Sequence, residues 1–274
     1  MKKALTYTLM TLSVIWTVWV LRSGAKDEGW RRFGISDGFE VFSGDYWTLL
    51  TSMFVHVNWM HLFFNVYWLN ILGCYTEVRY GRGFYAAFVV TCGFVTAMLE
   101  LSFGGQTGVG LSGVLYGIFG FLWGTTLFQK EEHEFLSKET VKMFLGWLVL
   151  CIVLTLAKVM SIANVAHLSG LLYGLLVART RSFRPGAARS WRMAVPLICL
   201  GLLFYSPWSY PWLASRAYKA HQIMRFTLAE SYYTKILALR PEDKWALLNR
   251  AKVLKALGRL EEAQKDLSRA DHAH

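Results

Sequence analysis

A serine and a histidine that could carry out acyl transfer both lie in apolar stretches of this sequence. Ser112, two residues after Gly110, lies at the start of one apolar run, and His167 lies in a later run. Polar side chains are costly at bilayer depth and are usually kept there for chemistry or transport. A histidine at hydrogen-bond distance activates a serine hydroxyl as a nucleophile. The later run has no acidic residue at that depth, so the pattern predicts hydrolysis inside a membrane by a Ser112–His167 dyad.

The residues around Ser112 strengthen this interpretation. A lone serine in a membrane helix commonly bonds its own backbone. Here Gly110 and Gly113 leave the hydroxyl without bulky neighbours, and Ser112 opens the predicted helix, where free N–H groups favour an anion. Tyr116, four residues on, shares the face of Ser112 and is expected to line the site.

Two further polar residues lie one helical turn apart in an earlier apolar run. His61 and Asn65 are expected on one helix face, where their N–H groups could stabilise an oxyanion together with the Ser112 amide. The alternative is that the pair only joins helices by hydrogen bonds. Gly170 and Gly174 form a small-residue face beside His167, which allows a neighbouring helix to approach closely.

Composition and charge indicate a multi-pass membrane protein. Of 274 residues, 54% are hydrophobic and 17% charged, which leaves too little polar surface for a soluble protein with an oversized core. The net charge of +11 includes a cluster typical of a cytoplasmic loop facing anionic lipid, so no nucleic-acid partner is expected. The cluster comprises Arg179, Arg181, Arg184, Arg189 and Arg192. The four cysteines, Cys74, Cys92, Cys151 and Cys199, have no metal-binding spacing and are expected to be small buried side chains.

The apolar runs predict up to seven membrane spans. They cover about residues 4–21, 60–75, 84–101, 112–128, 141–160, 162–178 and 193–205. The first run is expected to be a retained span rather than a cleaved signal peptide, with the N-terminus cytoplasmic. A polar loop is expected over residues 22–42, followed by an interfacial aromatic stretch over 46–59. The seventh run is short, and it ends near Trp212 at a predicted interface. Seven spans would place the C-terminus outside, whereas six would leave it in the cytoplasm.

From about Ser215 the composition becomes that of a soluble helical module. Ala229 and Tyr233 recur 34 residues later as Ala263 and Leu267, and Gly258 marks a turn. This resembles a tetratricopeptide repeat, with a plain helical hairpin as the alternative. We therefore expect a membrane domain over residues 1–180, a basic loop and seventh span over 181–214, and a repeat-like segment over 215–274.

Three motifs together resemble the rhomboid intramembrane serine proteases. They are His61-x-x-x-Asn65, Gly110-Leu111-Ser112-Gly113 with Tyr116, and Ala166-His167-x-x-Gly170-x-x-x-Gly174. The resemblance covers about residues 1–180 and implies a six-helix bundle with Ser112 as nucleophile and His167 as general base and acid. It also implies an oxyanion hole of His61, Asn65 and the Ser112 amide, and packing of Tyr116 on His167. Glu77 matches a family glutamate, whereas Thr48 after Trp47 departs from a common Trp-Arg pair in the outer loop.

These features predict an all-α polytopic membrane protein that cleaves transmembrane segments of other proteins. No metal or organic cofactor is expected. The expected partners are transmembrane substrates, the lipid bilayer and a protein bound by the C-terminal segment, and the expected location is a bacterial cytoplasmic membrane. A non-proteolytic membrane adaptor of the same fold is the main alternative, although such relatives typically lack the serine or the histidine. A small transporter is disfavoured, because the membrane half shows no internal duplication.

Overall fold

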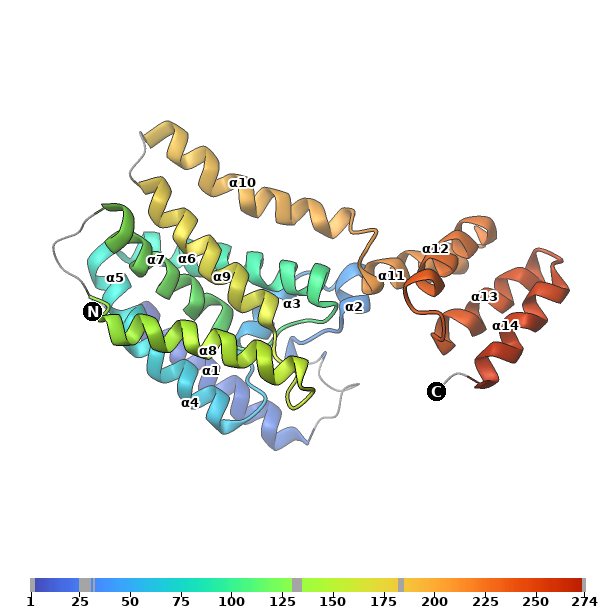
Figure 1. Ribbon diagram of the computed structural model, residues 1–274, viewed down its shortest axis with the longest axis horizontal. Coiled ribbons are helices and arrows are strands. Elements are labelled where there is room, and N and C mark those ends of the chain that lie inside the picture. The colour runs from blue at the N-terminus through green and yellow to red at the C-terminus, as the bar shows by residue number, and fades with distance from the viewer. Residues whose placement is uncertain (1–2, 25–30, 32, 130–134, 182–184, 273–274) are drawn as a thin grey trace. The chain divides into compact units, whose positions relative to one another are not determined.

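The computed structural model describes residues 3–24, 31, 33–129, 135–181 and 185–272, and every regular element within these ranges is a helix (Figure 1). The predicted all-α class is therefore confirmed for this part of the chain. The chain forms two compact units. The first comprises residues 1–36 and 46–204, and the second comprises residues 37–45 and 205–274.

The first unit contains the long apolar helices. Its α-helices are α1 (Ala4–Ser23), α3 (Thr48–Thr51), α4 (Trp59–Trp68), α5 (Cys74–Tyr80), α6 (Arg82–Leu99), α7 (Ser112–Gln129), α8 (Lys138–Leu156), α9 (Asn164–Arg181) and α10 (Pro185–Phe204). A 3-10 turn, Ser52–Phe54, follows α3, and π-helical turns η3 (Leu69–Gly73) and η4 (Glu100–Gly104) extend α4 and α6.

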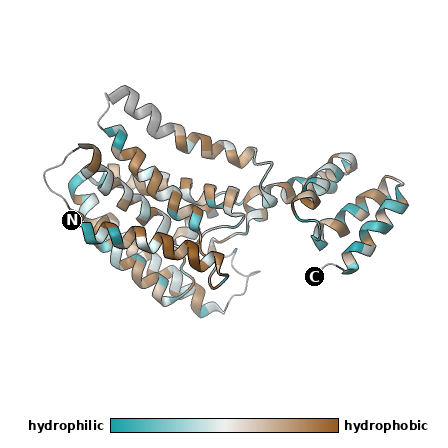
Figure 2. Ribbon diagram, in the orientation of Figure 1, coloured by the Kyte–Doolittle hydropathy of each residue, from teal (hydrophilic) through white to brown (hydrophobic). Residues whose placement is uncertain are grey.

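Several of these helices have the length and composition of membrane spans. Three qualify on both counts, namely Ala4–Ser23, Arg82–Gly104 and Lys138–Leu156, and Ser112–Phe128 and Ala194–Phe204 are shorter apolar helices. Figure 2 shows hydrophobic residues along much of α7, α8 and α9. Val149 and Val153 on α8 are more than half exposed, as expected of side chains that face lipid. Of the predicted basic cluster, Arg184 lies outside the described residues, and the structure does not describe the side chains of Arg189 and Arg192.

Glycines bring α7 and α9 into direct backbone contact. A Cβ atom on Gly174 would overlap the carbonyl oxygen of Gly117, and one on Gly120 would overlap the carbonyl oxygen of Leu171. Without side chains at these positions the two helices pack closely along their length, as membrane helices with small-residue faces do. Because Ser112 begins α7 and His167 lies in the first turn of α9, this contact determines how far apart the two residues stand.

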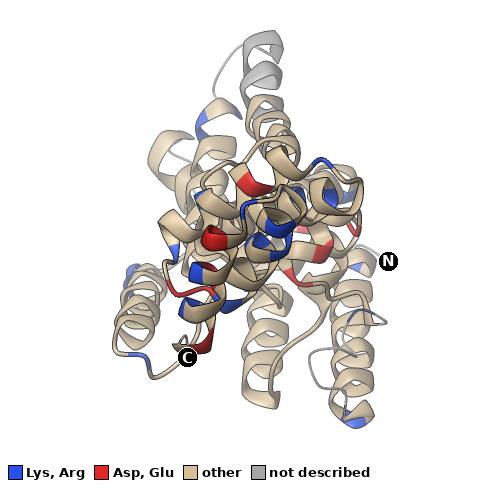
Figure 3. Cartoon of the chain, turned by 90° about the vertical axis from the view of Figure 1, so that its right-hand side faces the viewer, with Lys and Arg blue, Asp and Glu red and all other residues tan. Residues whose placement is uncertain are grey.

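The second unit is built from four helices with a repeating register. They are α11 (Tyr210–Gln222), α12 (Phe226–Leu239), α13 (Lys244–Ala256) and α14 (Leu260–His272). The α13 and α14 helices begin 34 residues after α11 and α12, respectively. Buried residues recur at the same interval, with Leu213 matched by Leu247 and Ala217 by Ala251. The 34-residue interval thus relates α11 to α13 as well as α12 to α14. These helices carry both basic and acidic residues (Figure 3).

A short helix from the predicted loop over residues 22–42 belongs to this second unit. It is α2 (Gly38–Ser43), which begins with a capping box formed by Asp37 and Glu40. The Phe39 ring packs edge-on against Tyr218 and Trp245, with ring centres 5.7 and 6.4 Å apart. The expectation of a loop was therefore wrong for residues 38–42, where an aromatic side chain packs against α11 and α13.

Trp212 also differs from its predicted interfacial role. It is buried within α11, with its ring 5.9 Å from both Tyr205 and Tyr232. Trp212 thus forms part of the core of the second unit, whereas Tyr205 and Trp208 are exposed.

Candidate active site

Ser112 and His167 form a direct hydrogen bond. The His167 Nε2 and Ser112 Oγ atoms are 2.8 Å apart, and the histidine is 5% exposed. Among the described residues, no group hydrogen-bonds to the buried Nδ1 of His167. In the tautomer with the proton on Nδ1, Nε2 accepts the serine hydroxyl proton. The pair is thus close enough for the imidazole to take the hydroxyl proton.

Tyr116 holds the His167 ring from one side. The two rings lie 4.8 Å apart at an interplanar angle of 32°. The Tyr116 hydroxyl donates a hydrogen bond to the carbonyl oxygen of Phe144 in α8, at 3.1 Å. Tyr116 is therefore fixed at both its ring and its hydroxyl, and it restricts rotation of the imidazole.

His61 lies against the loop that precedes Ser112. A Cβ atom on Gly110 would be 2.6 Å from Cε1 of His61, and Gly110 has a φ of +95°, a conformation that favours glycine. The backbone N–H of Gly110 donates to the carbonyl oxygen of Ser52 at 3.2 Å. Gly110 is thus needed both for its backbone angle and for the space that the His61 ring occupies.

Asn65 is buried one turn further along α4. Its Nδ2 donates to the carbonyl oxygen of His61 at 2.7 Å, and its Oδ1 has no hydrogen-bond partner in the described part of the chain. One of its two amide hydrogens is therefore engaged with its own helix, and the other remains available. The buried Nδ1 of His61 likewise makes no hydrogen bond to a described residue.

His56 and Thr17 also support the site, in roles that the sequence pattern did not show. The Leu111 N–H donates to Nε2 of the fully buried His56 at 3.4 Å. The His56 Nδ1 and Thr17 Oγ1 are 3.2 Å apart, and the His56 N–H donates to the same hydroxyl at 3.1 Å. These bonds tie the loop before Ser112 to α1. The sequence signal was the position of His56, five residues before His61.

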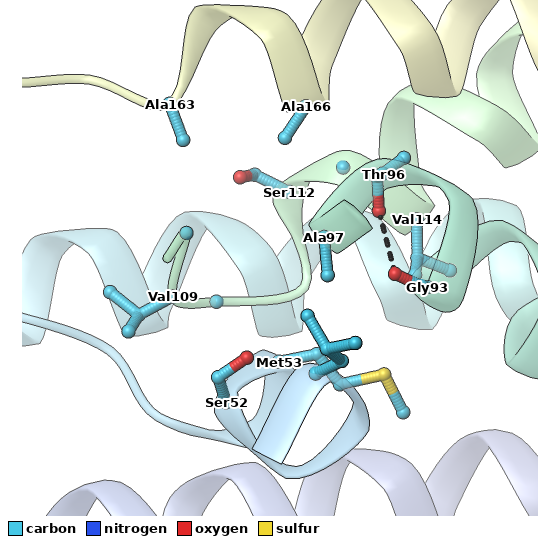
Figure 4. Close-up of a pocket in the computed structure, with 14 residues that line it drawn as sticks. Ser52, Met53, Gly93, Thr96, Ala97, Val109, Ser112, Val114, Ala163 and Ala166 are labelled. Atoms are coloured by element: carbon cyan, nitrogen blue, oxygen red, sulfur yellow. Dashed lines mark hydrogen bonds between the residues drawn. The ribbon is translucent and has the colours of Figure 1, made fainter. Parts of the chain in front are cut away.

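A small cavity of about 20 Å³ lies beside Ser112 (Figure 4). Figure 4 shows Ser112 between Ala97, near the end of α6, and two alanines on the other side, Ala163 just before α9 and Ala166 in its first turn. The cavity is lined mostly by small side chains, and its volume suits one water molecule. In the described ranges, no three His, Cys, Asp or Glu residues are grouped so that they could hold a metal ion.

Comparison with known proteins finds a family match that spans the residues of this candidate site. The family model described as "Rhomboid domain" matches residues 43–183, which contain His61, Asn65, Ser112 and His167. The chain is 28% identical to Rhomboid protease GlpG of Salmonella paratyphi A over 165 residues, which cover 60% of this chain and 53% of that relative. The proteins of the same name from Salmonella choleraesuis and Salmonella newport match with the same identity and coverage. The chain thus spans about half the length of the curated relatives it matches.

Proposed function

The chain belongs to the rhomboid family, and on that premise we propose that it is a serine endopeptidase that cleaves transmembrane segments of other proteins within the bilayer. Its apolar helices and its family make it an integral membrane protein. The observation that carries the proposal is the 2.8 Å contact between Nε2 of His167 and Oγ of Ser112.

In this reaction His167 acts first as general base and then as general acid. It accepts the Ser112 hydroxyl proton while Oγ attacks the carbonyl carbon of the scissile peptide bond. It then gives the proton to the leaving amine, so that an ester links the substrate to Ser112. Water, deprotonated by the same imidazole, hydrolyses this acyl-enzyme and releases the serine.

The negative charge of the tetrahedral intermediate develops at the N-terminal end of α7. The Ser112 N–H lies at a helix start, where N–H groups lack partners within the helix and the helix dipole favours an anion. His61 borders the preceding loop, and Asn65 has an amide hydrogen beyond the one bonded to its own helix. We assign the Ser112 amide, His61 and Asn65 to the oxyanion hole.

The substrates in this proposal are transmembrane helices that unwind locally. A helical peptide bond is shielded by its own hydrogen bonds, so residues that weaken a helix favour entry into the site. Because the relatives are bacterial, we place the enzyme in a bacterial cytoplasmic membrane. Its chemistry needs no metal or organic cofactor.

We also infer that α10 is a seventh span. The α2 helix follows the first span and belongs to the same compact unit as residues 205–274, so both must lie on one side of the membrane. The chain between them must then cross the membrane an even number of times, which spans two to seven satisfy. With the N-terminus cytoplasmic, the second unit is outside. A cysteine replacing Gly258 should then react with an impermeant reagent added from outside, and labelling only from inside would contradict this topology.

The second unit is proposed to be a tetratricopeptide-like module that binds a protein partner. The 34-residue register of its two helix pairs supports this assignment. Two such pairs fall below the usual number for a stable solenoid, and α2 adds a further packing surface to the module.

Cleavage of a model transmembrane substrate in reconstituted liposomes tests the protease assignment. The Ser112→Ala and His167→Ala variants should lose cleavage. The control is Ser169→Ala, because that serine lies in the same helix as His167 but its hydroxyl donates to the Ala166 carbonyl oxygen of its own helix. Cleavage by purified Ser112→Ala at the rate of the unaltered protein would contradict the proposal.

A further inference from the structure

A buried glutamate contacts the first turn of the helix that carries His167. Glu100 is the first residue of η4, at the end of α6, and is 2% exposed. Its Oε2 accepts a hydrogen bond from the backbone N–H of Ala166 at 2.9 Å, and the backbone N–H of Val165 also interacts with the carboxylate. Glu100 thus binds the two residues immediately before His167.

The N–H groups of Val165 and Ala166 lie in the first turn of α9, where they need hydrogen-bond acceptors from outside the helix. The first N–H groups of an α-helix have no partner within the helix. In α9, the Asn164 N–H donates to the carbonyl oxygen of Ile162 at 2.8 Å, and the His167 N–H donates to that of Ala163 at 3.2 Å. Val165 and Ala166 therefore depend on an acceptor from elsewhere, and Glu100 supplies it from 66 residues earlier in the chain. A carboxylate at this end also suits the helix dipole.

We propose that Glu100 is a positioning residue for His167. Glu100 caps α9 from the end of α6. It thereby holds the backbone next to His167 in the position that brings Nε2 within hydrogen-bond distance of Ser112 Oγ. The role rests on the proposed protease function. Small displacements of a reacting group are costly to a rate even when the fold is intact, so loss of this cap should reduce reactivity more than stability alone explains.

The turn that follows Glu100 is shaped to admit its carboxylate. A Cβ atom on Gly104 would overlap Oε1 of Glu100, and one on Gly108 would lie 3.6 Å from its Cγ and 3.3 Å from Cβ of Ala163. Gly104→Ala therefore offers a second variant, because it displaces the carboxylate without removing it.

The same device occurs at the start of α1, which makes a matched control available. The buried Glu77 accepts hydrogen bonds from the backbone N–H groups of Leu5 at 3.0 Å and Thr6 at 2.8 Å. It caps a helix that does not carry His167 or Ser112. Glu77→Ala should thus share the general cost of losing a buried cap but leave the His167 backbone in place.

Two measurements on the full-length protein in detergent or liposomes test the role. The first is hydrogen exchange at the Val165 and Ala166 amides, which does not depend on activity. The second is reactivity at the site. It is followed as the rate at which a fluorophosphonate labels Ser112 and as kcat and KM for a model substrate. We expect Glu100→Ala and Gly104→Ala to raise exchange at these amides and to lower kcat and the labelling rate by on the order of tenfold, with little change in KM. Glu100→Gln retains an acceptor oxygen, so its amide exchange and its labelling rate should be close to those of the unaltered protein.

The outcomes separate this role from the protease assignment. Unchanged exchange at Val165 and Ala166 in Glu100→Ala would overturn the capping role, whatever the activity. Equal slowing of labelling by Glu77→Ala would also overturn it, because the effect would then be general destabilisation. If the unaltered protein neither labels nor cleaves while exchange responds as expected, the protease proposal fails and the cap remains.

Discussion

Gly170 in α9 lies against the carbonyl oxygen of Gly113 in α7, so closely that a Cβ atom on Gly170 would overlap that oxygen. The contact lies one residue after Ser112 and three residues after His167. It therefore sets the spacing of the two helices at the level of the dyad. The backbone carbonyl cannot move aside as a flexible side chain could, so the helices themselves must separate if Gly170 gains a side chain.

Gly170→Ala is expected to lower activity sharply while the helices still form. Separation of α7 from α9 would lengthen the Ser112–His167 contact, and a displacement of about 1 Å can cost on the order of a hundredfold in rate. The measurement is kcat/KM in liposomes. Gly146→Ala in α8 is the control, because a Cβ atom there meets nothing within 4 Å. A Gly170→Ala enzyme with unaltered kcat/KM would show that the glycine contact does not set the catalytic distance.

Gly110→Ala should damage the site through His61. The new Cβ atom would press on the His61 ring, and its positive φ adds about 1–2 kcal/mol of backbone strain. Gly81→Ala is the matched control, since Gly81 has a φ of +89° but open space around its Cβ position. We expect both variants to lose thermal stability. Only Gly110→Ala should lose more fluorophosphonate reactivity than its loss of stability accounts for. Equal reactivity losses would refute a specific role for the space at Gly110.

Phe39→Ala tests whether α2 is part of the second unit. Removing the ring deletes its contacts with Tyr218 and Trp245, at an expected cost of about 2–3 kcal/mol for a partly buried aromatic residue. Hydrogen exchange should increase in α2 and in the facing turns of α11 and α13. Leu260→Ala, at a position 65% exposed, is the control. Unchanged exchange in α11 and α13 would show that α2 does not contribute to the unit.

Arg250 and Asp266 link α13 to α14 by a two-pronged ion pair. Arg250 Nε and Nη2 each lie 2.7 Å from an Asp266 carboxylate oxygen, and Asp266 is 2% exposed. Arg250→Met leaves this carboxylate buried without its partner, at a cost of about 3 kcal/mol. The double variant Arg250→Met/Asp266→Leu should recover much of the loss in thermal unfolding. If the double variant is as unstable as the single one, the cost does not come from the unpaired charge.

Much of the membrane domain could be predicted because its signals are local. Long apolar runs give helices, and glycines at positions 110, 113, 170 and 174 indicate close approach around Ser112 and His167. The second unit was harder. Ser43 and Ser215, whose hydroxyl oxygens are 3.1 Å apart, lie 172 residues apart in the chain. Nothing in a polar, glycine-containing loop shows that a six-residue helix within it packs on distant helices. Trp212 and its neighbours have the composition of a membrane interface, and only tertiary packing reveals that Trp212 is buried.

Contacts between distant residues also explain why parts of the site escaped prediction. His56 bonds the Leu111 amide and Thr17, and Glu100 caps a helix that begins 64 residues later. A buried carboxylate at the end of an apolar helix is visible in the sequence, but its partner is a backbone N–H group, which no residue type identifies. Ser112 and His167 could be singled out because a hydroxyl and an imidazole are recognisable from residue type alone.

The most direct test of the dyad is covalent labelling by a fluorophosphonate, with the modified peptide identified by mass spectrometry. The reagent reacts with an activated serine hydroxyl, and a membrane adaptor of the same fold would offer none. We predict a single adduct on Ser112, lost in Ser112→Ala, strongly reduced in His167→Ala and retained in Ser169→Ala. A protein that folds and stays unlabelled, or an adduct that persists in Ser112→Ala, would contradict the assignment of Ser112 as the nucleophile.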